Sequence, residues 1–251
     1  MLIKTKVLLV DPERPEKKTT QEVAKALRVG GIVSFPTETV YALGGDAYNQ
    51  EVVARIYRIK RRERSKPFSV FLKDAREVRK VVDSISEDAQ KLMERFLPGP
   101  LTLVFKSSSP KLSWVLAGGE KLGIRVSPSK LIHRILDEAR VPVTATSANP
   151  SGKKSCVVAN RVFYFFNGRI DLILDGGKSK IFLPSTVLDV SGEEVTLIRR
   201  GHIPVEEIEK VVSKVRVPEE ESNPDGSCEE VKVGLIPEIP PRRDDQAETE
   251  A

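Results

Sequence analysis

The chain of 251 residues contains only two cysteines and two histidines. Cys156 and Cys228 form no CxxC or mixed cysteine and histidine cluster, which argues against a disulfide framework and a structural zinc site. A Ser-His-Asp triad would have to use His133 or His202, and neither lies near a GxSxG turn. Nucleophilic serine chemistry of that kind is therefore disfavoured.

Long apolar runs are also missing. No run approaches the roughly 18–20 residues that a membrane-spanning helix needs, and the first six residues hold no apolar stretch suited to a signal peptide. We therefore expect a cytosolic protein with no membrane contact. The hydrophobic fraction of 39% and the charged fraction of 31% are those of a globular chain, and the length allows one large α/β domain with an extension.

Charge is distributed unevenly along the chain. Residues 218–251 contain 11 acidic and 3 basic residues, a net charge of −8, whereas the whole chain carries +5, so residues 1–217 carry +13. A basic body favours an anionic partner such as a nucleic acid, a nucleotide or an acidic metabolite, although a solvated lysine-rich surface gives the same count. The acidic, proline-rich tail 218–251 is predicted to be largely disordered.

Short apolar runs alternate with amphipathic segments, which predicts an α/β or α+β domain with a large, mixed sheet. Helices are expected at 19–31 with Thr19 as the N-cap, at 50–60, near 84–96, at 131–139 and at 205–215. Strands are expected at 7–10, 32–35, 68–72, 101–105, 123–126, 141–146, 171–174, 185–190 and 195–199. The pattern does not give the order of the strands in the sheet.

The two common phosphate-binding motifs are absent from the sequence. No GxGxxG follows a predicted strand, and Gly177-Lys178-Ser179 lacks the upstream glycine of a Walker motif because Leu172 holds that place, so a turn is the better interpretation. A cluster of cations is present instead, and its members are Arg55, Arg58, Lys60, Arg61, Arg62, Arg64 and Lys66. Cations at a helix C-terminus can bind phosphate or simply form a solvated face, and the cluster alone does not decide between these.

Three predicted loops at strand ends are rich in hydroxyl groups, at residues 35–44, 145–152 and 184–189. Such loops can surround an anion or a small polar ligand, because ligands of open α/β sheets bind beyond the strand ends. Serine, asparagine and glycine are equally common in ordinary turns. Three such loops together with the cationic cluster favour one shared site.

Seven stretches carry a family resemblance: Pro36-Thr-Glu-Thr-Val-Tyr-Ala-Leu-Gly, Lys60-x-Arg62, Leu97-Pro-Gly-Pro-Leu-Thr, Gly123-Ile-Arg, Thr146-Ser-Ala-Asn-Pro-Ser-Gly, Ser185-Thr-Val and Leu197-Ile-Arg-x-Gly. In this order they resemble the YrdC family of threonylcarbamoyl-AMP synthases, over roughly residues 15–212. The resemblance implies a twisted mixed α/β sheet with flanking helices around a large basic cavity. It also identifies 1–217 as a YrdC-like catalytic domain, with a tail too short to be the second domain of two-domain members.

The resemblance implies that L-threonine, bicarbonate and ATP are joined into L-threonylcarbamoyladenylate with release of pyrophosphate. The product would supply a threonylcarbamoyl transferase that acts on tRNA. A magnesium ion is expected with ATP, although the sequence offers no dedicated carboxylate cage, and no residue stands out as a general base. Two alternatives remain: a double-stranded RNA-binding protein that uses the same basic surface, and a family paralogue with another carbamoyl or nucleotide substrate.

Roles are carried over to matching positions only. Lys60 and Arg62 would be catalytic and would contact the phosphates of ATP. The other residues expected to bind ATP are Arg64, Ser147, Asn149, Ser155 and Arg199. The residues expected to bind threonine are Thr37, Arg125, Ala145 and Ser185. The sequence departs from the usual family pattern at Ala42, Arg61, Glu63 and Arg200, where glycine, glycine, proline and proline are usual.

Overall fold

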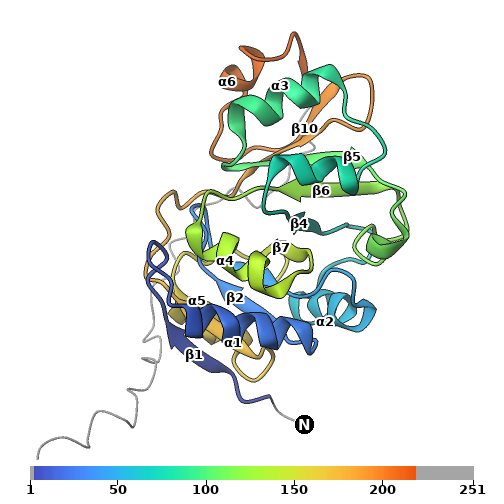
Figure 1. Ribbon diagram of the computed structural model, residues 1–251. Helices are drawn as coiled ribbons and strands as arrows, with labels where there is room; N and C mark the ends of the chain where they lie inside the picture. Colours follow the sequence, from blue (N-terminus) through green and yellow to red (C-terminus); the bar gives the residue numbers. More distant parts are fainter. Residues whose placement is uncertain (1–2, 219–251) are drawn as a thin grey trace, which may run out of the picture.

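The computed structural model describes residues 3–218, which form one mixed sheet flanked by helices (Figure 1). The strands are β1 (Lys6–Leu9), β2 (Val33–Phe35), β3 (Ala42–Gly44), β4 (Ser69–Phe71), β5 (Leu101–Lys106), β6 (Lys121–Arg125), β7 (Val143–Ser147), β8 (Leu172–Asp175), β9 (Thr186–Asp189), β10 (Val195–Arg199) and β11 (Val215–Arg216). The helices are α1 (Lys17–Arg28), α2 (Gln50–Lys60), α3 (Glu87–Phe96), α4 (Lys130–Ala139), α5 (Ala159–Phe166) and α6 (Val205–Glu209), with 3-10 helices η1 (Ala75–Lys80) and η2 (Pro110–Leu112).

Within the described residues the strand order is β1-β8-β2-β3-β7-β4-β6-β5-β9-β10-β11. The pairs β1–β8, β2–β8, β4–β6, β5–β9 and β10–β11 are parallel. The other neighbouring pairs are antiparallel. The predicted mixed sheet is therefore confirmed. No helix within residues 3–218 is long and apolar enough to cross a membrane.

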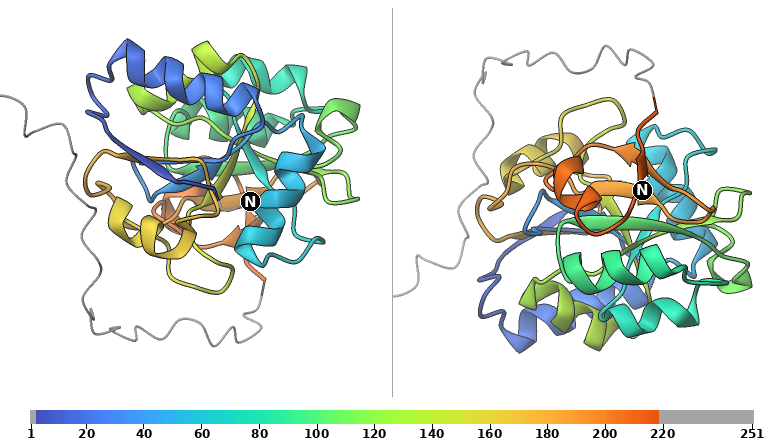
Figure 2. Two further views of the ribbon diagram at one scale, coloured as in Figure 1. Left: turned by 90° about the horizontal axis from the view of Figure 1, so that it is seen from below. Right: turned by 90° about the horizontal axis from the view of Figure 1, so that it is seen from above.

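Helices cover both faces of the sheet (Figure 2). On one face α1 and α4 lie side by side, and their apolar residues pack with Val33 and Phe35 of β2 and Ala42 of β3. The other face carries α2 and α5, which pack with Leu43 of β3. Alternate residues of a strand point to opposite faces, so the short strand β3 contributes to both layers of core.

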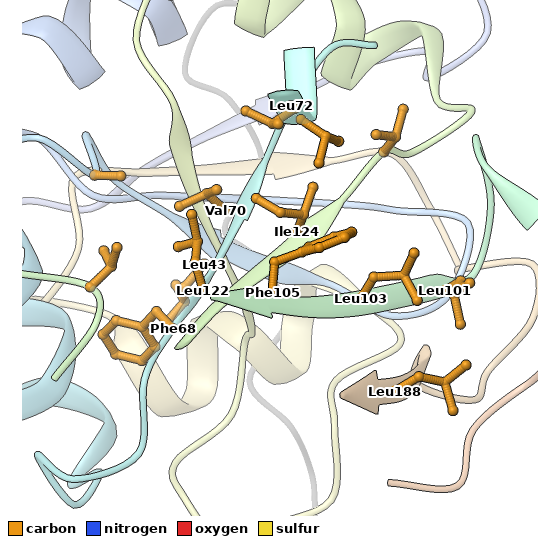
Figure 3. Close-up of a cluster of buried hydrophobic side chains, with 14 of the residues drawn as sticks. Leu43, Phe68, Val70, Leu72, Leu101, Leu103, Phe105, Leu122, Ile124 and Leu188 are labelled. Carbon is orange, nitrogen blue, oxygen red and sulfur yellow. The ribbon is translucent and has the colours of Figure 1, made fainter. Parts of the chain in front are cut away.

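The larger of the two hydrophobic clusters runs through the middle of the sheet (Figure 3). Its labelled residues in the figure come from β3 to β6 and β9 and from the residues on either side of β4, with Phe68, Phe105 and Ile124 at or below 1% exposure. The burial of this many aliphatic and aromatic side chains is the main stabilising contribution to such a domain. It also provides a rigid support for the loops at the strand ends.

Most predicted elements are confirmed, but two helix predictions are wrong in part. The first helix begins at Lys17, and Glu16 rather than Thr19 occupies the extended N-cap position. The predicted helix 205–215 is helical only as α6, since Val215 pairs in parallel with Val195 as part of β11. Strand pairing overrides the local helical pattern there. The predicted tail falls outside the described residues except for Pro218.

Candidate functional site

Lys60 is the last residue of α2, and its side chain points into the protein. Asn49 caps the helix by accepting hydrogen bonds from two backbone amides of the first turn. Val53, Ile56 and Lys60 follow one another on a single helical face, and the side chain of Lys60 continues this buried stripe with 2% exposure. The sequence therefore places an amine where an apolar residue is usual.

Two backbone carbonyls accept hydrogen bonds from the Lys60 amine. Its Nζ donates to the carbonyl of Ser147 and, at 2.6 Å, to that of Asn149. Burial, and secondarily the charge of Arg62, lowers the pKa of Lys60 to about 7. An approaching anion would stabilise the charged form of this amine, so proton uptake and anion binding are coupled at Lys60.

Residues 147–152 form the loop that receives Lys60. The amide of Ser151 donates to the carbonyl of Lys60 at 2.8 Å, which fixes the loop against the end of α2. The Asn149 side-chain nitrogen donates to the carbonyls of Pro150 and Lys153. Its Oδ1 is buried and has no partner among the described residues, and an unsatisfied buried acceptor of this kind indicates a place where a ligand or water donates.

Arg62 follows the helix and is fixed by contacts with its own loop. Arg61 adopts the left-handed conformation, with a φ of 52°, which ends α2 and turns the chain. The Arg62 guanidinium then donates to the carbonyls of Lys66 and Pro67 at 3.1 and 3.0 Å and lies over the Phe68 ring. Burial lowers the pKa of Arg62, but an arginine stays charged at neutral pH.

A pocket of about 210 Å³ lies between the end of α2 and the 147–152 loop. Its lining residues are Lys60, Arg61, Arg62, Glu63, Lys66, Ser147, Asn149, Ser151 and Gly152. Four of the predicted ATP-binding residues therefore meet in one pocket, namely Lys60, Arg62, Ser147 and Asn149. Arg64 and Ser155 are not among its lining residues. Cations and amide groups in this arrangement can bind phosphate oxygens.

Arg125 forms the centre of a second group of polar residues. Its Nη2 donates to Glu38 at 2.7 Å, to Thr39 at 2.5 Å and, more weakly, to Thr37 at 3.5 Å. The Thr37 hydroxyl also binds the backbone of its own turn, donating to the Val40 carbonyl at 2.7 Å. The predicted threonine-site residues Thr37 and Arg125 are thus brought together.

The sheet register places the predicted threonine-site residues of β6 and β7 on one face. Phe71 of β4 pairs with Arg125 on one side and with Val143 on the other. Side chains of paired residues share a face, and residues two apart on a strand do so as well. The side chains of Ala145 and Ser147 on β7 therefore lie on the same face of the sheet as the side chain of Arg125.

Ser185 and Arg199 form a third group, near the end of β10. The Arg199 Nη2 donates to the carbonyl of Ser185 at 2.8 Å and to its hydroxyl at 3.2 Å, and Ser185 also bonds the buried Thr102 hydroxyl at 2.8 Å. Desolvation, followed by the positive charges of Arg125 and Arg62, lowers the pKa of Arg199 to about 10, although the residue as a whole is exposed. The charges of Arg62 and Arg125 therefore both act on Arg199, which places Arg199 within electrostatic reach of the first two groups.

Sequence reasoning missed several residues of these groups. Glu38 and Thr39 lie inside a recognised stretch but were given no role, and Ser127 lies just beyond Gly123-Ile-Arg. Their partners are about 86 to 89 positions away, so local pattern could not reveal them. A larger cavity, of about 490 Å³, lies where β1 and β8 end, and none of the predicted site residues line it. The predicted large basic cavity stays a prediction.

A mixed α/β sheet with cations, hydroxyls and amides gathered in strand-end loops defines an α/β protein with a candidate anion-binding site. Residues 25–201 match the family model Sua5/YciO/YrdC, described as "Telomere recombination". The chain belongs to this family, as the sequence motifs predicted.

Known relatives are identical to the chain at about one third of the aligned positions. It is 36% identical over 205 residues to the threonylcarbamoyl-AMP synthase of Pyrococcus abyssi, which covers 82% of this chain and 60% of that protein. It is 37% identical over 219 residues to the threonylcarbamoyl-AMP synthase of Bacillus subtilis, with 86% and 63% covered. The crystal structure of P. abyssi Sua5 complexed with L-threonine is similar with a TM-score of 0.81 at 35% identity, over 85% of this chain and 62% of that one. The chain thus spans about 60% of the length of these relatives.

Proposed function

We propose that the protein is an L-threonylcarbamoyladenylate synthase, a nucleotidyltransferase that forms threonylcarbamoyl-AMP and pyrophosphate from L-threonine, bicarbonate and ATP. The names of the relatives from P. abyssi and B. subtilis support this activity. The observation that carries the proposal is the pocket in which Lys60, Arg62, Ser147 and Asn149 meet. Ser147 of this pocket and Ala145 of the proposed threonine pocket lie on one face of β7, the face that also carries Arg125, which supports a single site with two adjoining pockets.

The proposed reaction places increasing negative charge near the cations of the site. The threonine amine would condense with bicarbonate to a carbamate with loss of water. An oxygen of this carbamate would then attack the α-phosphorus of ATP and form the new P–O bond while the bond to pyrophosphate breaks, and charge would develop on the phosphoryl and leaving oxygens. Lys60 and Arg62 would bind these oxygens, and Ser147 would donate a hydrogen bond from its hydroxyl. The free Oδ1 of Asn149 would accept a hydrogen bond from a hydroxyl or amino group of the nucleotide. Arg64 and Ser155 would assist from outside the pocket lining, and Arg199 would pack on the nucleotide. Groups that are already oriented lower the barrier without reorganising.

The proposed threonine pocket combines Arg125, which would bind the carboxylate, with Thr37, Ala145 and Ser185. A guanidinium pairs well with a carboxylate because its donors lie in one plane. Fixing threonine beside the phosphate pocket would supply the proximity that the reaction needs. No general base is assigned.

Magnesium would enter with ATP. Within residues 3–218 no group of three His, Cys, Asp or Glu side chains could hold a metal ion, and Glu63, which lines the pocket, pairs with Lys66 at 3.2 Å. Magnesium commonly keeps several waters and binds substrate phosphates. The donor set therefore fits an ion held mainly by ATP and water. Cytosolic location and transfer of the product to tRNA by a separate transferase belong to the same proposal.

The test is pyrophosphate release by the purified full chain with ATP, Mg²⁺ and bicarbonate, measured with and without L-threonine. Release should require threonine and bicarbonate and should fall about 100-fold or more in Lys60→Ala. Lys214→Ala, which removes an exposed lysine paired with Glu194, is the control and should match the wild type. Release that ignores threonine would favour a paralogue with another substrate. No release, with salt-sensitive RNA binding in the absence of ATP, would favour the RNA-binding alternative.

A further inference from the structure

Glu38 is the principal charged partner of Arg125. Its Oε1 accepts from the Arg125 Nη2 at 2.7 Å, and the two side chains are 12% and 9% exposed. Its Oε2 accepts from the Ser127 hydroxyl at 2.6 Å. The carboxylate is therefore held at both oxygens, and it holds the arginine in turn.

Ser127 anchors this carboxylate to a rigid element. The Ser127 hydroxyl accepts from the amide of Ser129 at 3.2 Å, and Ser129 is the N-cap of α4. On the other side, the guanidinium of Arg125 lies over the Phe71 ring, with the two centres 5.5 Å apart. The position of Arg125 is thus fixed by a ring face and by a carboxylate tied to a helix start.

All the side-chain hydrogen bonds of Arg125 within the described residues are made by its Nη2, and the buried Nε stays unused. A buried guanidinium N–H without an acceptor is costly. An acceptor supplied by a ligand would satisfy it without disturbing the contacts of Nη2.

We propose that Glu38 is a positioning residue for amino-acid binding: it holds Nη2 of Arg125 so that Nε is presented to the substrate carboxylate, and it stays paired with Arg125 when the substrate binds. This rests on the proposed threonine site. The substrate then meets a guanidinium whose charge is partly balanced by Glu38. Binding of a carboxylate therefore does not require the buried ion pair to open.

Two other roles for Glu38 would predict different changes in threonine affinity. If the Glu38 carboxylate occupied the place of the substrate carboxylate, threonine would have to displace it, and removal of Glu38 would strengthen threonine binding. If Glu38 only stabilised the fold, its removal would lower the melting temperature and leave threonine affinity unchanged. The sign of the change in affinity therefore separates the three roles.

The experiment measures the threonine dissociation constant by calorimetry, and KM for threonine and ATP by pyrophosphate release, on the full chain. In Glu38→Ala we expect threonine to bind about tenfold or more weakly, with KM for ATP within about twofold of the wild type. Glu38→Gln keeps an acceptor for Arg125 and should stay within about threefold of the wild type. Ser127→Ala, which frees the carboxylate but keeps its charge, should fall between them.

A surface variant and the wild-type protein itself separate failure of this proposal from failure of the proposed function. Glu22→Ala, which removes a surface carboxylate paired with Lys6 at 2.6 Å, should bind threonine as the wild type does. Unchanged or tighter threonine binding in Glu38→Ala would overturn the positioning role while the synthase stands. If Glu38→Ala does not fold, the comparison of Glu38→Gln with Ser127→Ala decides, and equal affinities there refute the role. Wild-type protein that binds no threonine refutes both.

Discussion

The Nζ of Lys60 donates a 2.6 Å hydrogen bond to the backbone carbonyl of Asn149, which ties the end of α2 to the loop after β7. The same amine also donates to the carbonyl of Ser147, and the amide of Ser151 returns a hydrogen bond to the carbonyl of Lys60. Phosphate-site candidates from two distant parts of the chain are therefore fixed together. Lys60 holds the pocket in shape in addition to its proposed role toward ATP.

The lowered pKa of Lys60 predicts how stability changes with pH. The pKa is about 7 in the folded protein against an ordinary value of 10.5, so between these values the unfolded chain binds more protons than the folded one. The stability contribution of this residue therefore rises with pH in that window and is lowest below pH 7. We expect the free energy of unfolding of the wild type, relative to Lys60→Met, to increase by about 1 kcal/mol per pH unit between pH 7 and 9. Urea denaturation of both proteins at several pH values measures this, and a constant difference would contradict it.

The unpartnered Oδ1 of Asn149 predicts the effect of adding a charge to the pocket. Asn149→Asp places a carboxylate in the same pocket as Lys60 and Arg62, where it repels the phosphates of ATP, so KM for ATP should rise by about tenfold or more. Asn149→Ala removes one hydrogen-bond acceptor without adding a charge and should raise KM by only a few-fold. Asn167→Asp, at the exposed end of α5, is the matched control. Equal effects of Asp and Ala at position 149 would place the nucleotide phosphates away from this side chain.

Local pattern predicted α2 from Gln50 to Lys60 correctly, because its cap and apolar spacing are contained in eleven residues. It did not predict the burial of Lys60, since a lysine is usually exposed. That burial depends on carbonyls 87 and 89 positions away. The family motifs supplied the residues of the site, whereas the contacts that hold them come from the tertiary structure.

Glu38 shows the same limit more clearly. It lies within the recognised Pro36-Thr-Glu-Thr stretch, yet nothing near it in the sequence indicates that it pairs with Arg125. The end of the described chain shows the same limit of local sequence patterns. The apolar spacing of 205–215 suits a helix, but Val215 instead forms part of a strand that pairs with Val195. In both cases a distant partner decides the structure.

The left-handed backbone conformation of Arg61 leads us to expect that its replacement by glycine stabilises the fold. It holds a φ of 52° as the residue that ends α2, a conformation in which glycine is unstrained and other residues are not. Arg61→Gly should therefore raise the free energy of unfolding by about 1 kcal/mol. Arg140 ends α4 in the same conformation, with a φ of 57°, so Arg140→Gly should give a similar gain. Thermal and urea unfolding check both, and a loss at Arg61 alone would mean that its side chain makes a stabilising contact in the pocket.

The close packing around Gly201 leads us to expect that its replacement by alanine lowers both the stability and the activity of the protein. A Cβ at this position would lie 2.3 Å from the backbone nitrogen of Thr186 and 2.5 Å from the carbonyl oxygen of Ser185, and backbone atoms cannot move aside cheaply. Gly201→Ala must therefore shift Ser185, whose carbonyl and hydroxyl accept from Arg199. We expect a loss of about 2 kcal/mol in the free energy of unfolding.

Because Ser185 and Arg199 belong to the proposed site, threonine-dependent pyrophosphate release by Gly201→Ala should also fall below that of the wild type at a temperature at which both proteins stay folded. Gly192→Ala is the matched control, since a Cβ there meets nothing within 4 Å. It should change the stability by no more than about 0.5 kcal/mol and leave the activity unaltered. A destabilised Gly201→Ala that keeps full activity would remove Ser185 and Arg199 from the site, because their displacement would then have no effect on the reaction.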